Sequence, residues 1–275
     1  MEPVIEKISQ MGIVPVVTLE DAKDARALAE ALSRGGLPCA EVTFRTDAAE
    51  EAIRIMSREV PEMLVGAGTV LSVEQAERAL AAGAKFMVSP GFQEKVIRYG
   101  RERGCPVLPG VSNPSEVGRA AELGLDVVKF FPAEQNGGIA MLKALAAPYP
   151  QMKFMPTGGI TEENLRAYLD FDRIVACGGS WMVKKELVET GRFDEIERLT
   201  QNAVSRMLGF EIDLLEGTAE MVAVTTRDMR RALYHLRQRG VLGEDLSMVT
   251  QEKKSIREIR FQLKPGGTCF QLMQR

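Results

Sequence analysis

Short apolar runs alternate with amphipathic segments between residues 12 and 180. Compact β-branched runs are typical of buried strands, whereas apolar positions that recur every three to four residues predict helices. The predicted strands are IVPVV (13–17), CAEVTF (39–44), MLVGAG (63–68), KFMVSP (85–90), CPVLPG (105–110), DVVKFF (126–131), KFMPTGG (153–159) and RIVACGG (173–179). Helix start and stop signals lie between them, such as Thr46 and Ser72 as caps and Gly83 as a stop.

The alternation of strands and helices favours an α/β fold, specifically a (β/α)8 TIM barrel. Parallel strands need helical crossovers, and eight such strands can close on themselves. An open doubly wound sheet is the alternative, but it would carry a dinucleotide fingerprint. The segment GAGTVL (66–71) lacks the third glycine of that loop.

The pattern changes after the amphipathic segment 193–209. EMVAVTT reads as a strand, RDMRRALYHLRQRG as a helix, and IREIRFQL with TCFQLMQ as a hairpin across the PGG at 265–267. We therefore predict a barrel domain over residues 1–208 and a small βαββ extension over 209–275. The extension is too short for a robust core of its own, so we expect it to pack on the barrel or on another subunit.

The amino-acid composition restricts the possible functions of the protein more than it restricts the choice of fold. The formal net charge is −3 and there is no basic run, which argues against nucleic acid as a partner. No signal peptide or membrane span is recognisable, so we expect a cytoplasmic protein. The four cysteines are scattered along the sequence, and His235 is its single histidine. We therefore expect no metal site and no cofactor. Any acid–base catalysis must then be carried out by carboxylates, lysine, tyrosine or water.

Lys129 stands out inside the apolar run DVVKFF. The active site of a barrel lies at the carboxyl ends of its strands, and Lys129 is the lysine predicted near such an end. Lys85 and Lys153 begin their strands and belong to the opposite face. Burial disfavours the charged ammonium and would make Lys129 a nucleophile able to form a Schiff base. Alternatively, its side chain reaches outward or pairs with a carboxylate.

Glu41 lies on the predicted inner face of CAEVTF, because alternation places it with Cys39, Thr43 and Arg45. A carboxylate inside a barrel must be paired or functional. It could simply neutralise Lys129 or Arg45. It could also move protons beside a Schiff-base lysine, and the two interpretations are compatible.

Glycine pairs follow the seventh and eighth predicted strands, in PTGGI and CGGSW. Tight turns alone would explain either pair. Loops at these positions of a barrel often offer backbone N–H groups to a phosphate, and Ser180 adds a hydroxyl. The two pairs together favour a phosphate site.

Seven motifs resemble those of the family of 2-keto-3-deoxy-6-phosphogluconate (KDPG) and 4-hydroxy-2-oxoglutarate (KHG) aldolases. They are EVTFRT, VGAGTVL, SPGF, PGVSNPSE, VVKFFPAE, MPTGGI and CGGSWMV, and the resemblance runs from about residue 3 to 208. It implies a class I aldolase on a (β/α)8 barrel, needing no metal, that cleaves a small 2-keto acid to pyruvate, in a homotrimer.

The resemblance also implies site roles. It makes Lys129 the Schiff-base lysine and Glu41 the general acid–base. The other matching positions are Arg45 and Thr69 for the pyruvyl carboxylate, Pro90 and Thr157 for the pocket shape, and Gly158, Gly159, Gly179 and Ser180 for the phosphate.

Two features depart from the family pattern. Thr18 stands where many members carry an arginine, and the loss of that arginine would shift the substrate preference toward unphosphorylated 4-hydroxy-2-oxoglutarate.

The extension resembles the last part of a glyoxalase-type (vicinal oxygen chelate) module. Its His235 is expected on the polar face of its helix, and a packing or oligomer-contact role is favoured over metal binding.

Two other functions remain open on the sequence. A phosphate-binding barrel isomerase would use Glu41 as a base, with Lys129 as an electrostatic clamp and no Schiff base. A ligand-sensing binding protein would use the extension to transmit a signal.

Overall fold

The computed structural model describes residues 2–213, 221–242, 258–262 and 269–274. The chain divides into two units, Met1–Ala203 and Val204–Arg275. None of the described helices is both long and apolar enough to cross a membrane.

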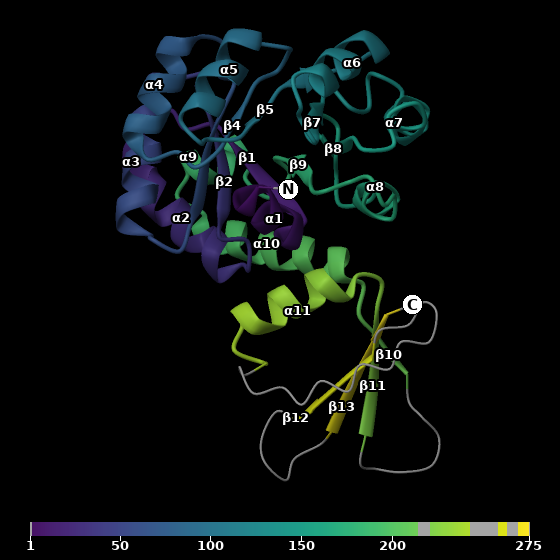
Figure 1. Cartoon of the computed structure of the whole chain (residues 1–275). Coiled ribbons are helices and arrows are strands. Elements are labelled where there is room, and N and C mark those ends of the chain that lie inside the picture. Colours follow the sequence, from purple (N-terminus) through teal and green to yellow (C-terminus); the bar gives the residue numbers. More distant parts are fainter. Residues whose placement is uncertain (1, 214–220, 243–257, 263–268, 275) are drawn as a thin grey trace. The chain divides into compact units, whose positions relative to one another are not determined.

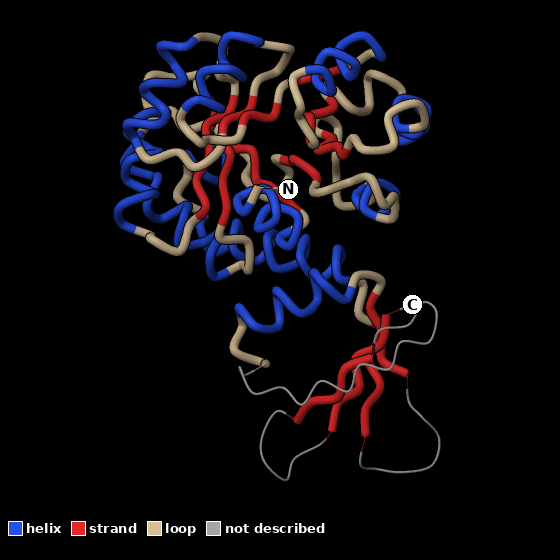
Figure 2. Tube along the Cα trace, viewed as in Figure 1, coloured by secondary structure: helices blue, strands red, loops and turns tan. Residues whose placement is uncertain are grey.

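The first unit alternates strands and helices along the chain (Figures 1 and 2). Its elements are α1 (Pro3–Met11), β1 (Ile13–Val17), η1 (Ala22–Asp24), α2 (Ala25–Arg34), β2 (Cys39–Thr43), α3 (Ala49–Glu59), β3 (Leu64–Gly68), α4 (Val73–Ala82), β4 (Met87–Val88), α5 (Glu94–Glu102), β5 (Val107–Leu108), β6 (Gly110–Val111), α6 (Pro114–Glu122), β7 (Val127–Phe130), α7 (Gly138–Ala146), β8 (Lys153–Pro156), α8 (Leu165–Leu169), β9 (Cys177–Gly179), α9 (Lys185–Glu189) and α10 (Phe193–Leu208). The last helix continues into the second unit.

The strands of the first unit form two parallel sheets. The six-stranded sheet has the order β5-β4-β3-β2-β1-β9, and the three-stranded sheet has the order β6-β7-β8. Only Pro109 separates β5 from β6. Two parallel bridges, Phe154–Ile174 and Thr157–Gly178, connect the region of β8 with the region of β9. The α/β class and the parallel pairing are thus confirmed, while closure into one barrel stays a prediction.

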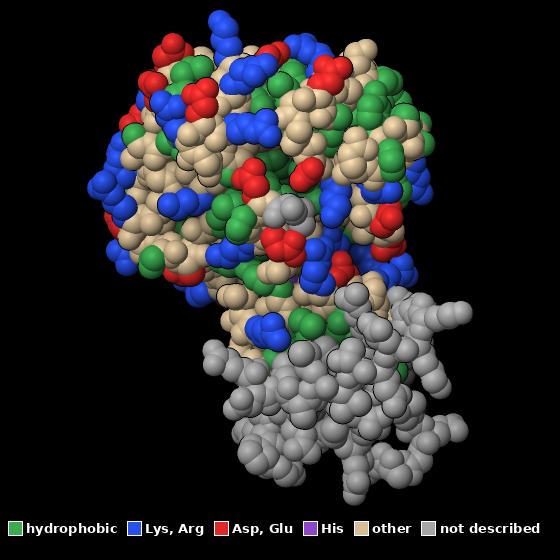
Figure 3. All heavy atoms as spheres, viewed as in Figure 1, with side chains coloured by type: hydrophobic (Ala, Val, Ile, Leu, Met, Phe, Trp, Pro, Cys, Tyr) green, Lys and Arg blue, Asp and Glu red, His purple; other side chains and the backbone are tan. Residues whose placement is uncertain are grey.

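Helices α2, α3 and α4 cover the outer side of the six-stranded sheet (Figure 1). Their apolar faces are buried, with Leu28, Ile53 and Ala79 fully shielded from solvent. Their outer faces carry ion pairs such as Arg54–Glu50 and Arg78–Glu50. Basic and acidic side chains are accordingly intermixed over the first unit on the face that Figure 3 shows.

All eight predicted runs contain strand residues, but only β1 fills its run; the other strands are shorter than predicted and one run is divided. The fourth run forms only β4, the eighth forms only β9, and the fifth splits at Pro109. Proline lacks the N–H that a continuous ladder needs, which explains the division. The cap predicted at Thr46 is wrong, because its hydroxyl donates to the Leu19 carbonyl and the helix begins at Ala49.

The helix signals of α4 are confirmed, whereas α1 lies outside the strand–helix units that the sequence predicts. Ser72 accepts a hydrogen bond from the Gln75 N–H, as an N-cap does, and Gly83 ends the helix at φ +108°. Helix α1 precedes the first strand and buries Ile5, Ile8 and Met11.

The second unit contains β10 (Glu211–Asp213), β11 (Met221–Thr226), α11 (Met229–Gln238), β12 (Glu258–Gln262) and β13 (Cys269–Gln274). The sheet order is β10-β11-β13-β12, with β11 parallel to β13 and the other pairs antiparallel. The predicted strand–helix–strand–strand pattern is confirmed, and β10 is an addition to it. The predicted PGG turn lies outside the described residues.

The expected position of His235 on the polar face of α11 is wrong. Its side chain is buried, as are those of Met229 and Ala232. These residues follow one another at three-residue spacing, so they share a face of the helix. Within the described part of the chain, no cluster of three or more His, Cys, Asp or Glu residues could hold a metal ion.

Candidate active site

Lys129 and Glu41 meet inside the first unit, although 88 residues separate them. Lys129 lies on β7 and Glu41 on β2, and the distance from Lys129 Nζ to Glu41 Oε1 is 3.2 Å. Their side chains are 6% and 1% exposed, so the pair is shielded from water. The ring of Phe131 lies 5.1 Å from the ammonium nitrogen. A buried lysine and a buried carboxylate in contact can exchange a proton without solvent.

Two buried polar atoms have no hydrogen-bond partner among the described residues. They are Glu41 Oε2, in the pair itself, and Thr157 Oγ1, directly after β8, the strand that pairs with β7. An unsatisfied buried polar group costs about 1–3 kcal/mol, so a native fold rarely keeps one without a use. Both atoms can therefore bind a ligand at no loss of internal hydrogen bonds.

The two glycines of β3 make room for neighbouring side chains, Gly68 for Glu41 and Gly66 for Phe86. A Cβ at Gly68 would lie 2.5 Å from Glu41 Oε1, and a Cβ at Gly66 would lie 2.3 Å from the Phe86 ring. Any larger residue at position 68 would displace the carboxylate. The next residue, Thr69, has φ +57°, which is strained for a β-branched side chain. The end of β3 is therefore shaped around the site.

Arg45 follows β2 and its side chain is exposed. Its Nε donates to Thr43 Oγ1 at 3.2 Å. Within the described residues the guanidinium has no ion pair with a carboxylate. It is therefore free to bind an anionic ligand.

Pro90 lies against Gly110 of β6, the strand that pairs with the strand of Lys129. A Cβ at Gly110 would be 2.0 Å from the Pro90 carbonyl oxygen, and Gly110 pairs with Lys129 between β6 and β7. Glycine at position 110 thus permits Pro90 to approach the site.

The two glycine loops lie next to each other. The Thr157–Gly178 bridge joins them, and Gly158 and Gly159 follow Thr157 at φ +97° and +78°. Their carbonyl groups accept hydrogen bonds from Glu134 N and Asn164 Nδ2, but their N–H groups have no acceptor among the described residues. Consecutive free N–H groups suit an anion.

The second loop is packed closely against an aromatic ring. A Cβ at Gly179 would lie 1.8 Å from the ring of Trp181, so only glycine fits there. Ser180 connects these two residues and is exposed. A ligand can therefore reach its hydroxyl.

A pocket of about 160 Å³ lies beside Thr18. Glu20, Asp21, Asp24 and Glu189 line it with Lys23, Lys185 and Val188. Carboxylates outnumber ammonium groups there, which disfavours a phosphate dianion.

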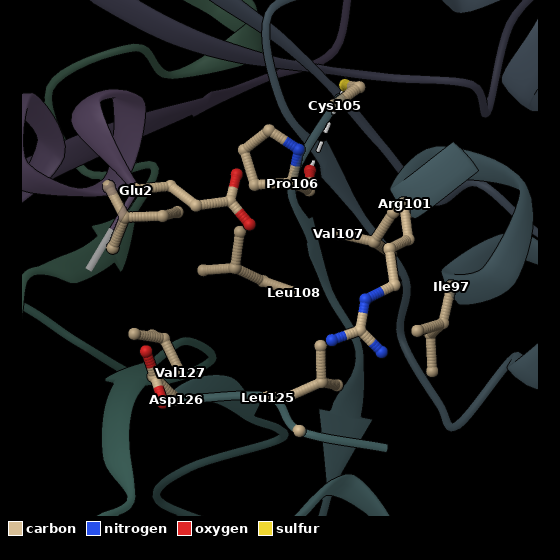
Figure 4. Close-up of a pocket in the computed structure, with 12 residues that line it drawn as sticks. Glu2, Ile97, Arg101, Cys105, Pro106, Val107, Leu108, Leu125, Asp126 and Val127 are labelled. Atoms are coloured by element: carbon tan, nitrogen blue, oxygen red, sulfur yellow. Dashed lines mark hydrogen bonds between the residues drawn. The ribbon is translucent and has the colours of Figure 1, made fainter. Parts of the chain in front are cut away.

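A second pocket, of about 80 Å³, is lined by β5 and by the start of β7, and Lys129 is not among its lining residues (Figure 4). Its lining includes Arg101, Cys105 and Asp126. Burial raises the pKa of the Cys105 thiol to about 12, so a thiolate nucleophile is disfavoured at neutral pH.

Sequence reasoning missed three contributors to this region. The sequence pattern places Thr43 on the inner face without indicating a role for it, and it shows Gly68 only as part of the motif VGAGTVL. Glu134 follows the apolar run DVVKFF that contains Lys129, and its carboxylate accepts a hydrogen bond from the Tyr168 hydroxyl. An inward-facing hydroxyl was a usable signal for Thr43, whereas the other two depend on contacts between distant segments.

The family model described as "Aldolase: KDPG and KHG aldolase" matches residues 4–199. A 2-dehydro-3-deoxy-phosphogluconate aldolase of Treponema pallidum is 48% identical over 204 residues, which are 74% of this chain and 97% of that protein. The KHG/KDPG aldolase of Escherichia coli K12 is 43% identical over 192 residues, 70% of this chain and 90% of that protein.

Solved structures show the same similarity. A KDPG aldolase from Legionella pneumophila, with pyruvate captured as a covalent carbinolamine intermediate, has a TM-score of 0.71 and 37% identity. The match covers 74% of this chain and 98% of that one. The aldolase of Zymomonas mobilis ZM4 with 3-phosphoglycerate has a TM-score of 0.68 and 41% identity, covering 72% and 94% of the two chains.

Proposed function

We propose, since the chain belongs to the KDPG and KHG aldolase family, that it is a class I aldolase acting on a small 2-keto acid. Its reaction is the cleavage of 2-keto-3-deoxy-6-phosphogluconate to pyruvate and glyceraldehyde 3-phosphate, of 4-hydroxy-2-oxoglutarate to pyruvate and glyoxylate, or of both. The observation that carries this proposal is the buried 3.2 Å contact between Lys129 Nζ and Glu41 Oε1.

The buried pair suits the steps of this reaction. Glu41 can take a proton from the Lys129 ammonium, which leaves a neutral amine to attack the C2 ketone. Loss of water from the carbinolamine gives a protonated imine that accepts electrons. Removal of the C4 hydroxyl proton, by Glu41 directly or through water, breaks the C3–C4 bond. Protonation of the enamine at C3 and hydrolysis of the imine release pyruvate and restore Lys129.

The remaining residues would bind the substrate. We assign the pyruvyl carboxylate to Arg45 and Thr69, because the Arg45 guanidinium has no ion pair of its own among the described residues. Pro90 and Thr157 would shape the pocket, and the unpartnered Thr157 hydroxyl could donate to a substrate oxygen. A phosphate would bind at Gly158, Gly159, Gly179 and Ser180, whose first two N–H groups have no internal acceptor.

Trapping with pyruvate and borohydride tests the Schiff base. The purified protein should gain a reduced pyruvyl adduct on the tryptic peptide that contains Lys129. Lys129→Gln should gain none, whereas Lys153→Gln, at the start of β8, should be labelled like the wild type. An unlabelled wild-type protein would contradict the Schiff-base mechanism and favour the isomerase alternative.

Thr18 supports a preference for the unphosphorylated substrate. Its hydroxyl lies 2.9 Å from Thr43 Oγ1, and the pocket beside it carries more carboxylates than ammonium groups. An arginine there would add a phosphate-binding cation that threonine lacks. We therefore propose 4-hydroxy-2-oxoglutarate as the better substrate.

The larger assembly is also a proposal. We propose that β5 and β6 act as one interrupted strand, so that eight strand positions close into a (β/α)8 barrel through the bridges between β8 and β9. We propose a homotrimer, a barrel domain over residues 1–208 and a glyoxalase-like extension over 209–275. Sedimentation equilibrium would test the trimer.

A further inference from the structure

The Thr43 hydroxyl lies at the centre of three hydrogen-bonded contacts. Thr43 Oγ1 donates to the Val17 carbonyl at 3.0 Å, lies 2.9 Å from Thr18 Oγ1, and accepts from Arg45 Nε at 3.2 Å. A hydroxyl has one proton and two lone pairs. Because the Val17 carbonyl receives that proton, Thr18 must be the donor in the threonine pair. Every hydrogen-bonding position of Thr43 is then occupied.

This arrangement determines how Arg45 presents its guanidinium. The Arg45 side chain is exposed, and among the described residues Thr43 is its hydrogen-bonding partner. A long exposed side chain would otherwise sample many rotamers. With Nε bound to Thr43, the two terminal Nη groups remain for a ligand. Thr43 itself is buried and anchored to β1, so it is a fixed point of attachment.

The same strand also carries Glu41, two residues before Thr43 and on the same face. The register of β1 and β2 pairs Val17 with Val42, which brings Thr18 opposite Thr43. Strand β2 thus carries both Glu41, whose carboxylate contacts Lys129, and Thr43, whose hydroxyl accepts the hydrogen bond from Arg45. The positions of the two groups are therefore coupled through the β2 backbone.

We propose that Thr43 is a positioning residue that directs the Nη groups of Arg45 toward the carboxylate of the bound 2-keto acid, with Thr18 orienting the Thr43 hydroxyl. The inference rests on the proposed role of Arg45 in binding that carboxylate. It adds a residue that touches no substrate and acts through the guanidinium alone.

The test compares Thr43→Val, which has nearly the same shape without the hydroxyl, with Thr43→Ser, which retains it. The measurement is the pyruvate concentration that gives half-maximal borohydride trapping. Loss of a hydrogen bond to a charged group should raise it about tenfold in Thr43→Val. Thr43→Ser should stay within about threefold of the wild type, and KM should change more than kcat.

Two further measurements separate positioning from a general loss of structure. Pyruvamide lacks the anionic carboxylate, so Thr43→Val should bind it about as well as the wild type does and lose the preference for pyruvate. In an Arg45→Ala background, Thr43→Val should have no additional effect on pyruvate trapping. Should Thr43→Val fail to fold, Thr43→Ala takes its place in all three measurements.

An unchanged half-saturating pyruvate concentration in the folded variant would overturn the inference, as would an undiminished effect of Thr43→Val in the Arg45→Ala background. Failure of the proposed function is a distinct result, because the wild-type protein itself would then form no adduct.

Discussion

Replacing Gly68 by alanine should impair catalysis through one methyl group. The new Cβ would lie 2.5 Å from Glu41 Oε1 and 2.7 Å from Cγ, whereas ordinary contact begins at 3.4 Å. Glu41 must therefore move by about 0.9 Å, and its 1% exposed side chain cannot swing into solvent. A shift of that size away from Lys129 would lengthen the 3.2 Å contact beyond hydrogen-bonding range.

The expected magnitudes follow from this displacement. Overpacking a core position costs about 1–3 kcal/mol of folding stability. Misplacing a reacting group by about 1 Å can lower the rate by about 100-fold, or about 2.7 kcal/mol of barrier. We expect kcat/KM for 4-hydroxy-2-oxoglutarate to fall by about that factor, measured by coupling pyruvate release to lactate dehydrogenase.

Gly66→Ala is the matched control on the same strand. Its Cβ would meet the Phe86 ring at 2.3 Å instead of Glu41. It should lower the free energy of unfolding by a comparable amount and reduce kcat/KM by less than about threefold. Equal losses of kcat/KM in the two variants, or full activity in Gly68→Ala, would refute the reasoning.

Three further predictions concern specificity, pH dependence and local stability. Thr18→Arg should raise the ratio of kcat/KM for the phosphorylated substrate over that for 4-hydroxy-2-oxoglutarate, and an unchanged ratio would contradict the substrate argument. Burial and the hydrogen bond to Glu134 raise the pKa of Tyr168. The Tyr168 phenol should therefore stabilise the fold fully at pH values below its unfolded-state pKa of about 10, and this stabilisation should decrease as the pH rises above 10. The Tm advantage of wild type over Tyr168→Phe should therefore shrink above pH 10, and a constant difference would count against this link. Ser72→Ala should lower the free energy of unfolding in urea by about 1 kcal/mol through loss of the α4 cap, with Ser72→Thr as the conservative control.

The boundaries of the elements show where sequence patterns stop being sufficient. Ser72 and Thr46 are equivalent as caps by sequence, yet Ser72 caps α4 while Thr46 donates to the Leu19 carbonyl. The second outcome depends on Leu19, which follows β1 and lies 27 positions before Thr46 in the sequence. The prediction for His235 is wrong because a polar side chain need not face solvent, and the spacing from Met229 and Ala232 places it on the buried face of α11.

The approximate positions of the strands, and Lys129 and Glu41 as the candidate catalytic pair, could be predicted from the amino-acid sequence. Hydrophobic periodicity indicates which positions of a local segment are buried. A charged side chain within an apolar run can therefore be recognised without knowing where that run lies in the fold. The folded structure, in contrast, was needed to show that these two side chains lie 3.2 Å apart and that Gly68 leaves space for the carboxylate. It also decided that Thr43 joins Thr18 to Arg45. Such contacts depend on the register of neighbouring strands, which is set by the packing of the whole sheet and is absent from any one segment.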